Sequence, residues 1–454
     1  MPGCGCAVRT NPLESSKLMG GVHERFSVID TIVVAALIIA FIDEGVRKSL
    51  PGAPVLVTGI KDILLIGGGL FLLSSKNGKM YRRMLTPFGP WVIYSVISAL
   101  YVYLYDGSTL HLILTLKVYT LGIFIAIVGS YVAANEELSI KVWVVLFCGA
   151  VYAFCVGAMQ EHAKDLLPGF YNRKIFIEKH SLAKGEYIES VFSSPQTFSL
   201  SMIILSYMAL YKLLSERRSG YIYGGLMLLS IYGVYLSRIR VALFLDLVGM
   251  FAILILYISP YMRRRLLISI SLFLIILVPC YVFVVGMNGG SLELQDMEFY
   301  RDLVDMDKLR GRVEYGLKLS SSSRDFGLSI FGYGAGTSGE LRRFLNNQWR
   351  FGPGAEDSGF TQYHYQFGLL GVFLFFAPLG LSLFGVSSQN KRNAINYTLI
   401  GAVIIMCWVL YVWLVFKANS IVVNGFSSMI LYLSFGYAIG AVYRKRQEAK
   451  SKYV

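Results

Sequence analysis

The chain has 454 residues, of which 55% are apolar and only 15% are charged, and its mean hydropathy is +0.57. Such a composition excludes a water-soluble protein of this length. The net charge of +14 therefore does not indicate nucleic-acid binding, because no soluble domain is left to carry a basic face. The apolar residues form separate blocks of roughly 18–25 residues, long enough for helices that cross a hydrocarbon core of about 30 Å. The sequence predicts an all-α polytopic membrane protein of about twelve transmembrane helices.

The predicted spans follow one another along the chain and leave one large gap after the ninth. We expect them at Phe26–Asp43, Pro54–Leu73, Phe88–Tyr105, Leu110–Val132, Ile140–Gly157, Val191–Leu213, Tyr221–Leu236, Val241–Ile258, Leu266–Val285, Tyr365–Phe384, Ala394–Val415 and Ile421–Val442. Residues 1–25 form an N-terminal tail, and residues 26–286 contain nine spans with a loop at 158–190. Residues 287–364 form a large loop, residues 365–442 contain the last three spans, and residues 443–454 form a basic tail.

Basic residues follow the even-numbered spans, and this bias predicts which side each loop faces. They are Lys76, Lys79, Arg82 and Arg83 after the second span, Lys212, Arg217 and Arg218 after the sixth, Arg263, Arg264 and Arg265 after the eighth, Lys391 and Arg392 after the tenth, and Arg444, Lys445 and Arg446 after the last. Both termini are therefore expected in the cytoplasm, and the loop Asn135–Lys141 is the one exit of this set that is not strongly basic. The loops at 158–190 and 287–364 and the turn at Ser237–Arg240 then face outside.

The cysteines indicate neither a disulfide framework nor a metal site. Four of them lie in apolar blocks and two in the N-terminal tail, and they are Cys148, Cys155, Cys280, Cys407, Cys4 and Cys6. The basic residues of the outer loops instead favour an anionic partner, such as a phosphate or a pyrophosphate.

The turn between the seventh and eighth spans carries Arg238 and Arg240. Two arginines on the outer side break the basic-inside bias and lie where a buried charge needs a partner. Guanidinium groups bind phosphate oxygens bidentately, which favours a site for a diphosphate. The alternative is that both side chains extend to lipid headgroups.

The large loop contains a glycine run at Gly332, Gly334 and Gly336. No Lys-Ser/Thr pair follows it, so a nucleotide-binding loop is not favoured. Two interpretations stay open: a set of turns that need positive φ angles, or backbone N–H groups that bind an anion.

Three titratable residues precede or begin the tenth span. Glu356 and Asp357 are adjacent carboxylates that can serve as a general base or simply face solvent. His364 follows Asp357 by seven residues, so both can face one cavity if the segment is helical. An interfacial histidine without a chemical role is the alternative.

Four segments, taken in this order, resemble motifs of the O-antigen polymerase and O-antigen ligase superfamily of bacterial envelope glycosyltransferases. They are Phe192–Phe198, with Pro195 among hydroxyl residues; the Ser-Arg turn at Ser237–Leu243; Arg312–Tyr315 with the glycine run; and Asp357–Phe360, followed by Gly368 and Gly371. The resemblance covers roughly residues 191–383, and the earlier spans match in hydropathy alone.

The resemblance implies an all-α fold of the GT-C kind with a large periplasmic loop. It implies action on undecaprenyl-pyrophosphate-linked glycans, without a nucleotide sugar, a metal or another cofactor. Arg238 or Arg240, together with Arg312, is expected to bind the donor pyrophosphate. Ligases of the family carry a histidine where this chain has Asp357, so the acid favours the polymerase branch, with Glu356 and His364 as rival bases.

The sequence thus predicts a polymerase in the bacterial inner membrane whose active site faces the periplasm. It would transfer the growing glycan, of O-antigen or a related surface polysaccharide, onto a sugar hydroxyl of the next lipid-linked repeat. One alternative is a ligase that transfers the glycan to lipid A–core. Another is a transporter or flippase, which is less favoured because only a few charges, such as Lys61, Asp62, Lys117 and Asp246, lie within spans. Besides the lipid bilayer and the lipid-linked glycans, a chain-length regulator is a candidate partner, and nucleic acid is not.

Overall fold

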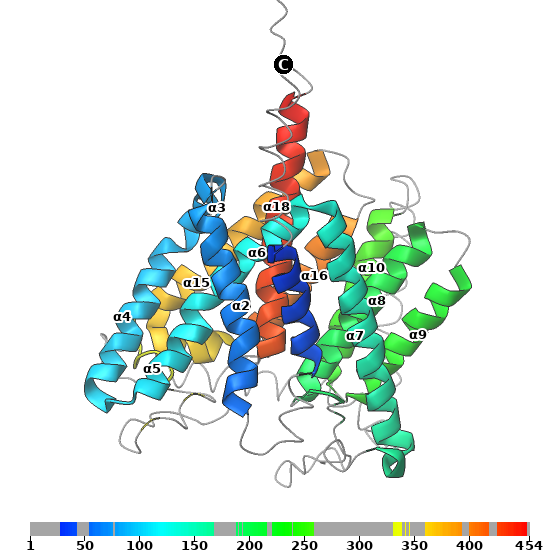
Figure 1. Ribbon diagram of the computed structural model, residues 1–454, viewed down its shortest axis with the longest axis horizontal. Helices are drawn as coiled ribbons and strands as arrows, with labels where there is room; N and C mark the ends of the chain where they lie inside the picture. The colour runs from blue at the N-terminus through cyan, green and yellow to red at the C-terminus, as the bar shows by residue number, and fades with distance from the viewer. Residues whose placement is uncertain are drawn as a thin grey trace, which may run out of the picture.

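The computed structural model describes residues 28–42, 54–75, 78–167, 188, 190–192, 194–215, 220–237, 239–257, 330–337, 341, 345, 359–392, 399–416 and 425–451. Within these ranges the chain is helical, with no strand among them. Figure 1 shows long helices that run side by side as one bundle. The described part of the chain therefore has the all-α architecture that the sequence predicts.

The helices begin and end close to the predicted spans. They are the first helix, Val28–Ile42, then α2 (Pro54–Ser74), α3 (Gly78–Leu85), α4 (Gly89–Asp106), α5 (Thr109–Leu116), α6 (Gly122–Ala134), α7 (Glu136–His162), α8 (Pro195–Ser215), α9 (Gly220–Leu236), α10 (Arg240–Tyr257), α15 (Gly359–Arg392), α16 (Leu399–Phe416) and α18 (Gly425–Ser451). A helix coincides with each predicted span except Leu266–Val285, which lies outside the described residues.

Six of the described helices are long and apolar enough to cross a membrane, as expected for an α-helical membrane protein. They are Tyr81–Asp106, Thr109–Ala134, Glu136–His162, Pro195–Ser215, Gln362–Ser387 and Phe426–Tyr443. Shorter apolar helices occupy Val28–Ile42, Gly220–Leu236, Val241–Ile255 and Gly401–Leu414. The total of twelve crossings stays a prediction.

The predicted loop Asn135–Lys141 is wrong, because only Asn135 separates α6 from α7. The Asn135 side-chain oxygen accepts a hydrogen bond from the Leu138 N–H at 3.2 Å and so caps α7. Glu136 and Glu137 occupy the first turn of that helix, where the helix dipole favours negative charge. The helix start therefore explains why this exit carries acids rather than the expected basic cluster.

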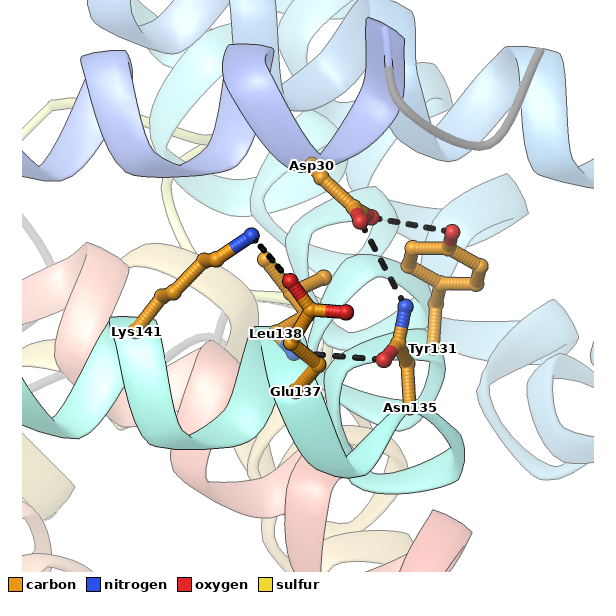
Figure 2. A network of polar contacts seen from close by, with 6 residues as sticks. All are labelled: Asp30, Tyr131, Asn135, Glu137, Leu138 and Lys141. Carbon is orange, nitrogen blue, oxygen red and sulfur yellow. Dashed lines mark hydrogen bonds and ion pairs between the residues drawn. The ribbon is translucent and has the colours of Figure 1, made fainter. Parts of the chain in front are cut away.

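The same corner fixes the first helix in place, as Figure 2 shows. Asp30 accepts hydrogen bonds from the Tyr131 hydroxyl at 3.1 Å and from the Asn135 amide at 3.5 Å. Nearby, Lys141 pairs with Glu137 at 2.6 Å on an exposed face of α7, where such a pair adds little stability. Asp30 thus joins the first helix to the α6–α7 junction.

Helix α6 lies at the centre of the bundle, between α2 and α18 (Figure 1). Gly436 and Gly440, four residues apart, lie on the face of α18 that meets α6. A Cβ atom at Gly436 would collide with the Ala126 carbonyl, and one at Gly440 would lie 2.7 Å from the Ser130 backbone. Such small residues let helices approach closely where no hydrophobic effect drives their association.

The bundle has two distinct ends. At the top of Figure 1 lie α3 and the end of α18, and we call this the tail end. At the opposite end, the loop end, lie the α4–α5 turn at Gly107 and the end of α7 at His162.

The α9–α10 turn and the start of α8 also lie at the loop end. His162 Nε2 lies 2.6 Å from the Tyr232 hydroxyl, near the end of α9. Ser190, just before α8, exchanges two hydrogen bonds of 2.8 and 3.1 Å with the Gln160 side chain. The described parts of two predicted outer segments, 158–190 and Ser237–Arg240, therefore share one end, although which side of a membrane that end faces stays a prediction.

Candidate functional site

The glycine run lies in residues 330–337, a segment whose backbone is irregular from Gly332 onward and that inserts among α4, α5 and α15. We call it the glycine segment. Ser98 of α4 accepts a hydrogen bond from the Ala335 N–H at 2.9 Å. Ser98 stands eight residues before the end of α4, so the segment reaches roughly 12 Å into the bundle from the loop end. Irregular backbone at that depth must have its polar groups satisfied by the protein or by water in a cavity.

Every backbone N–H from Tyr333 to Thr337 has a partner inside the protein. The acceptors are the Tyr365 carbonyl for Tyr333 (3.0 Å), the Gln366 carbonyl for Gly334 (2.9 Å), Ser98 Oγ for Ala335 (2.9 Å), Gln366 Oε1 for Gly336 (2.8 Å) and the Gly334 carbonyl for Thr337 (3.4 Å). These N–H groups are therefore not available to an anion in this structure. Of the two open interpretations, the set of turns is the one that the structure supports.

At the three glycines of the run, the backbone angle and the lack of space both exclude a residue with a side chain. Their φ angles are 73°, 109° and 77° at Gly332, Gly334 and Gly336, in the region that L-residues rarely adopt. Space is also missing: a Cβ atom at Gly336 would collide with His111 and lie 2.7 Å from Thr115 Oγ1. The glycine run is thus needed for docking against the helices.

The glycine segment also completes a break in α15. Gly368, with φ 63° and ψ −173°, interrupts the helix, so residues 359–367 form a separate half-helix. Carbonyls before such a break need new partners. The segment supplies N–H groups to the Tyr365 and Gln366 carbonyls, and the Tyr94 hydroxyl lies 2.9 Å from the Phe367 carbonyl. The half-helix and the segment therefore satisfy each other's backbone.

His111 is the functional candidate that sequence reasoning missed. Its side chain is 1% exposed, and its Nε2 lies 3.3 Å from the Gly336 carbonyl oxygen and 3.4 Å from Thr115 Oγ1. Because a carbonyl can only accept, Nε2 carries the hydrogen in the first contact. Nδ1 has no hydrogen-bond partner within the described ranges. The available signal was the spacing of His111 and Thr115, four residues apart on one face of the largely apolar α5.

His364 is the predicted catalytic residue that the structure describes most fully. It is half-buried in the half-helix, between Tyr363, which is fully buried, and Tyr365, which is partly buried. The Tyr365 ring stacks on Tyr333 of the glycine segment, with 4.5 Å between the ring centroids. Docking of the segment thus fixes the backbone directly after His364.

The other predicted site residues are described only in part. Arg240 is the first residue of α10, and its side chain lies outside the described part of the structure. The preceding turn is tight: the Ser237 hydroxyl donates to the Val234 carbonyl at 2.6 Å and accepts from the Ile239 N–H at 3.3 Å. Four further predicted site residues lie outside the described ranges: Arg238, Arg312, Glu356 and Asp357. Their contacts with the donor or acceptor stay predictions.

Four of the charged residues within predicted spans lie in the bundle, and three of them, Lys61, Asp62 and Asp246, are buried. Lys117 pairs with Asp62, the Ser206 hydroxyl donates to Asp246, and Lys61 and Asp246 are 1% and 0% exposed. Burial among helices removes Lys61, Asp62 and Asp246 from lipid, where an unpaired charge is costly, whereas the Lys117 side chain is 31% exposed and is paired with Asp62.

Lys117 begins a short π-helix, Lys117–Leu121, that joins α5 to α6. The Trp91 indole donates to the Tyr119 carbonyl at 2.8 Å, and the Ser95 and Thr120 hydroxyls pair at 2.8 Å. Single π-turns of this kind occur often at functional sites. Here the π-helix follows directly after the residues of α5 that contact the glycine segment.

Neither comparison with known proteins identifies a relative. No protein-family model matches the chain. No curated protein matches it either. The resemblance of the four sequence segments to envelope glycosyltransferases therefore stays a prediction.

Proposed function

We propose that this chain is a membrane glycosyltransferase that polymerises undecaprenyl-pyrophosphate-linked glycan repeats. One observation carries the proposal: sequence segments that are far apart along the chain lie at the same end of the bundle, the loop end. They are the start of α8 at Pro195, the α9–α10 turn at Ser237, the glycine segment and the half-helix that begins at Gly359. A site for two lipid-linked substrates needs such a gathering at one membrane face, and a rigid frame to orient the reacting groups.

The proposal assigns the loop end to the periplasm of a bacterial inner membrane. Exposed arginines on α3, Arg82 and Arg83, lie at the tail end, which supports a cytoplasmic tail end. A fold of the GT-C kind with twelve spans belongs to the same proposal. Labelling of intact cells with an impermeant thiol reagent tests the orientation. Ser321→Cys should react and Lys79→Cys should not, and the reverse pattern would invert the assignment.

The proposed reaction breaks one bond and forms another at the same anomeric carbon. The bond between that carbon and the donor's phosphate oxygen breaks, and the pyrophosphate leaves with its electron pair. Arg312 and one of Arg238 and Arg240 stabilise the charge that develops on it. The acceptor's sugar hydroxyl attacks the carbon, and its proton passes to a base, for which we assign Asp357 with Glu356 and His364 as rivals.

The half-helix is the element that gives this assignment physical support. Asp357 stands two positions before the first residue of α15, and His364 lies within the half-helix itself. A base is effective only when it is held within hydrogen-bond reach of the proton that it accepts. Docking of the glycine segment holds the backbone of the half-helix in place, and this helps to keep a base there within reach of the proton.

Deletion of the gene in its host separates the three functions weighed here. Loss of a polymerase leaves glycan of a single repeat on the surface. Loss of a ligase leaves no glycan there, and loss of a flippase leaves lipid-linked repeats inside the cell. The purified chain in liposomes should also convert lipid-linked repeats into a ladder of longer glycans. Surface glycan of normal length after deletion, or no ladder in liposomes, would contradict the proposal.

A further inference from the structure

We infer that Ser98, His111 and Gln366 are positioning residues that hold the glycine segment and, through it, the half-helix that carries His364. The inference rests on the proposed function for its chemical meaning, whereas the docking itself can be measured separately. The three side chains come from α4, α5 and α15. They form hydrogen bonds with neighbouring backbone groups: Ser98 with the Ala335 N–H, His111 with the Gly336 carbonyl, and Gln366 with the Gly336 N–H.

Docking depends on these side chains because the segment has few other means of satisfying its buried backbone. Ala335 is 0% exposed, as is Gln366, so water does not replace a missing partner at either group. Loss of one partner leaves a buried N–H or carbonyl unpaired, which favours withdrawal of the segment. Withdrawal in turn exposes the Tyr365 and Gln366 carbonyls at the break of α15. The position of His364 therefore depends on side chains that are distant in sequence.

Two variants of His111 distinguish a positioning role from a role as a base. In His111→Gln the side-chain amide nitrogen can take the place of Nε2 and donate to the Gly336 carbonyl, but no basic nitrogen remains. His111→Leu removes the donor as well. If His111 positions the segment, His111→Gln should keep at least about half of kcat, and His111→Leu should lose about 10-fold or more with KM changed less than about twofold.

Serines on α4 provide a matched control. Ser98→Ala removes the acceptor of the Ala335 N–H, whereas Ser95→Ala removes a buried hydrogen bond to Thr120 and leaves the segment untouched. Both serines are buried on the same helix, three residues apart. Ser98→Ala should lower kcat by about 5-fold or more, and Ser95→Ala should leave it within about twofold.

A disulfide cross-link measures docking without any assay of glycan synthesis. The Tyr333 N–H lies 3.0 Å from the Tyr365 carbonyl and the two rings stack with 4.5 Å between their centroids, so cysteines at both positions would face each other for linkage. Tyr333→Cys and Tyr365→Cys are combined in a full-length chain whose six native cysteines are replaced, and the membranes are oxidised. Trypsin cuts between the two positions at Arg342 and Arg350, so a linked pair of peptides reports docking by mass spectrometry.

The cross-link should form fully in the background chain and with His111→Gln, and its yield should fall at least about threefold with His111→Leu or Ser98→Ala. Full cross-linking with both of the latter variants would overturn the inference. Equal loss of turnover in His111→Gln and His111→Leu, with docking intact in the first, would also overturn it, because His111 would then act through its basic nitrogen. If the cross-links behave as expected but the chain makes no polymer, the docking inference stands. Only the proposed function is then refuted.

Discussion

The loop end and the tail end of the bundle satisfy their buried polar groups in different ways. At the tail end, Asn135 caps a helix and Asp30 accepts bonds from residues at the adjoining α6–α7 junction. At the loop end, irregular backbone is inserted among three helices, and its partners are up to 237 residues away in the sequence. The tail end is therefore assembled from regular helix packing, whereas the loop end depends on a long-range arrangement of the kind on which binding and catalytic sites are built.

The largest expected effect at the loop end is on the chemical step. Asp357→Asn keeps the shape of the side chain but not its basicity, so turnover by the purified enzyme should fall by about 10²–10⁴ while donor binding persists. Loss of Arg240 or Arg312 should weaken donor binding as well. Near-normal turnover by Asp357→Asn, together with collapse of His364→Ala, would move the base to His364.

The next prediction distinguishes the cost of placing a side chain at a positive φ angle from the cost of a clash with the surrounding atoms. Gly336→Ala introduces a methyl group against His111 at a φ of 77°, whereas Gly107→Ala meets open space at a φ of 71°. Strain alone should cost Gly107→Ala about 1 kcal/mol of unfolding free energy. Gly336→Ala should lose most turnover and more stability, measured by thermal unfolding in detergent. Equal behaviour of the two variants would mean that close packing of the glycine segment is unimportant.

Between the two ends, where α18 packs against α6, a comparable change should affect stability without affecting chemistry. Gly436→Ala places a methyl group against the Ala126 carbonyl of α6, and such overpacking costs about 1–3 kcal/mol. Gly385→Ala is the control, because no atom lies within 4 Å of its added Cβ and alanine favours a helix. Thermal unfolding should distinguish them. A Gly436→Ala chain as stable as wild type would show that α6 and α18 can separate without cost.

The smallest effect should come from the contact that holds the first helix. Tyr131→Phe removes the hydroxyl that donates to Asp30, and loss of one such hydrogen bond costs about 1 kcal/mol. Turnover should stay within about twofold of wild type, because the contact lies at the opposite end from the proposed site. A strong loss of turnover with normal stability would show that the two ends are coupled.

Much of the helical framework was predictable because its signals are local. Span Pro54–Leu73 coincides with α2, and Tyr221–Leu236 with α9, since the length of an apolar block sets the length of a helix. The Asn135–Lys141 loop was predicted wrongly, because a cap and two acids allow a helix to begin within polar sequence. The glycine run was visible in the sequence, but its docking partners were not.

By itself, therefore, the sequence determined an all-α chain with helices long enough for a membrane, and it marked the glycines at 332, 334 and 336 as positions of unusual backbone. Only the tertiary structure decided that these glycines dock against Ser98 and His111, and that α15 breaks at Gly368 with its carbonyls satisfied by the same segment. The physical reason is that hydropathy and helix length act within about 20 residues. A hydrogen bond between residues 225 positions apart, such as that from His111 to Gly336, exists only once the helices have packed.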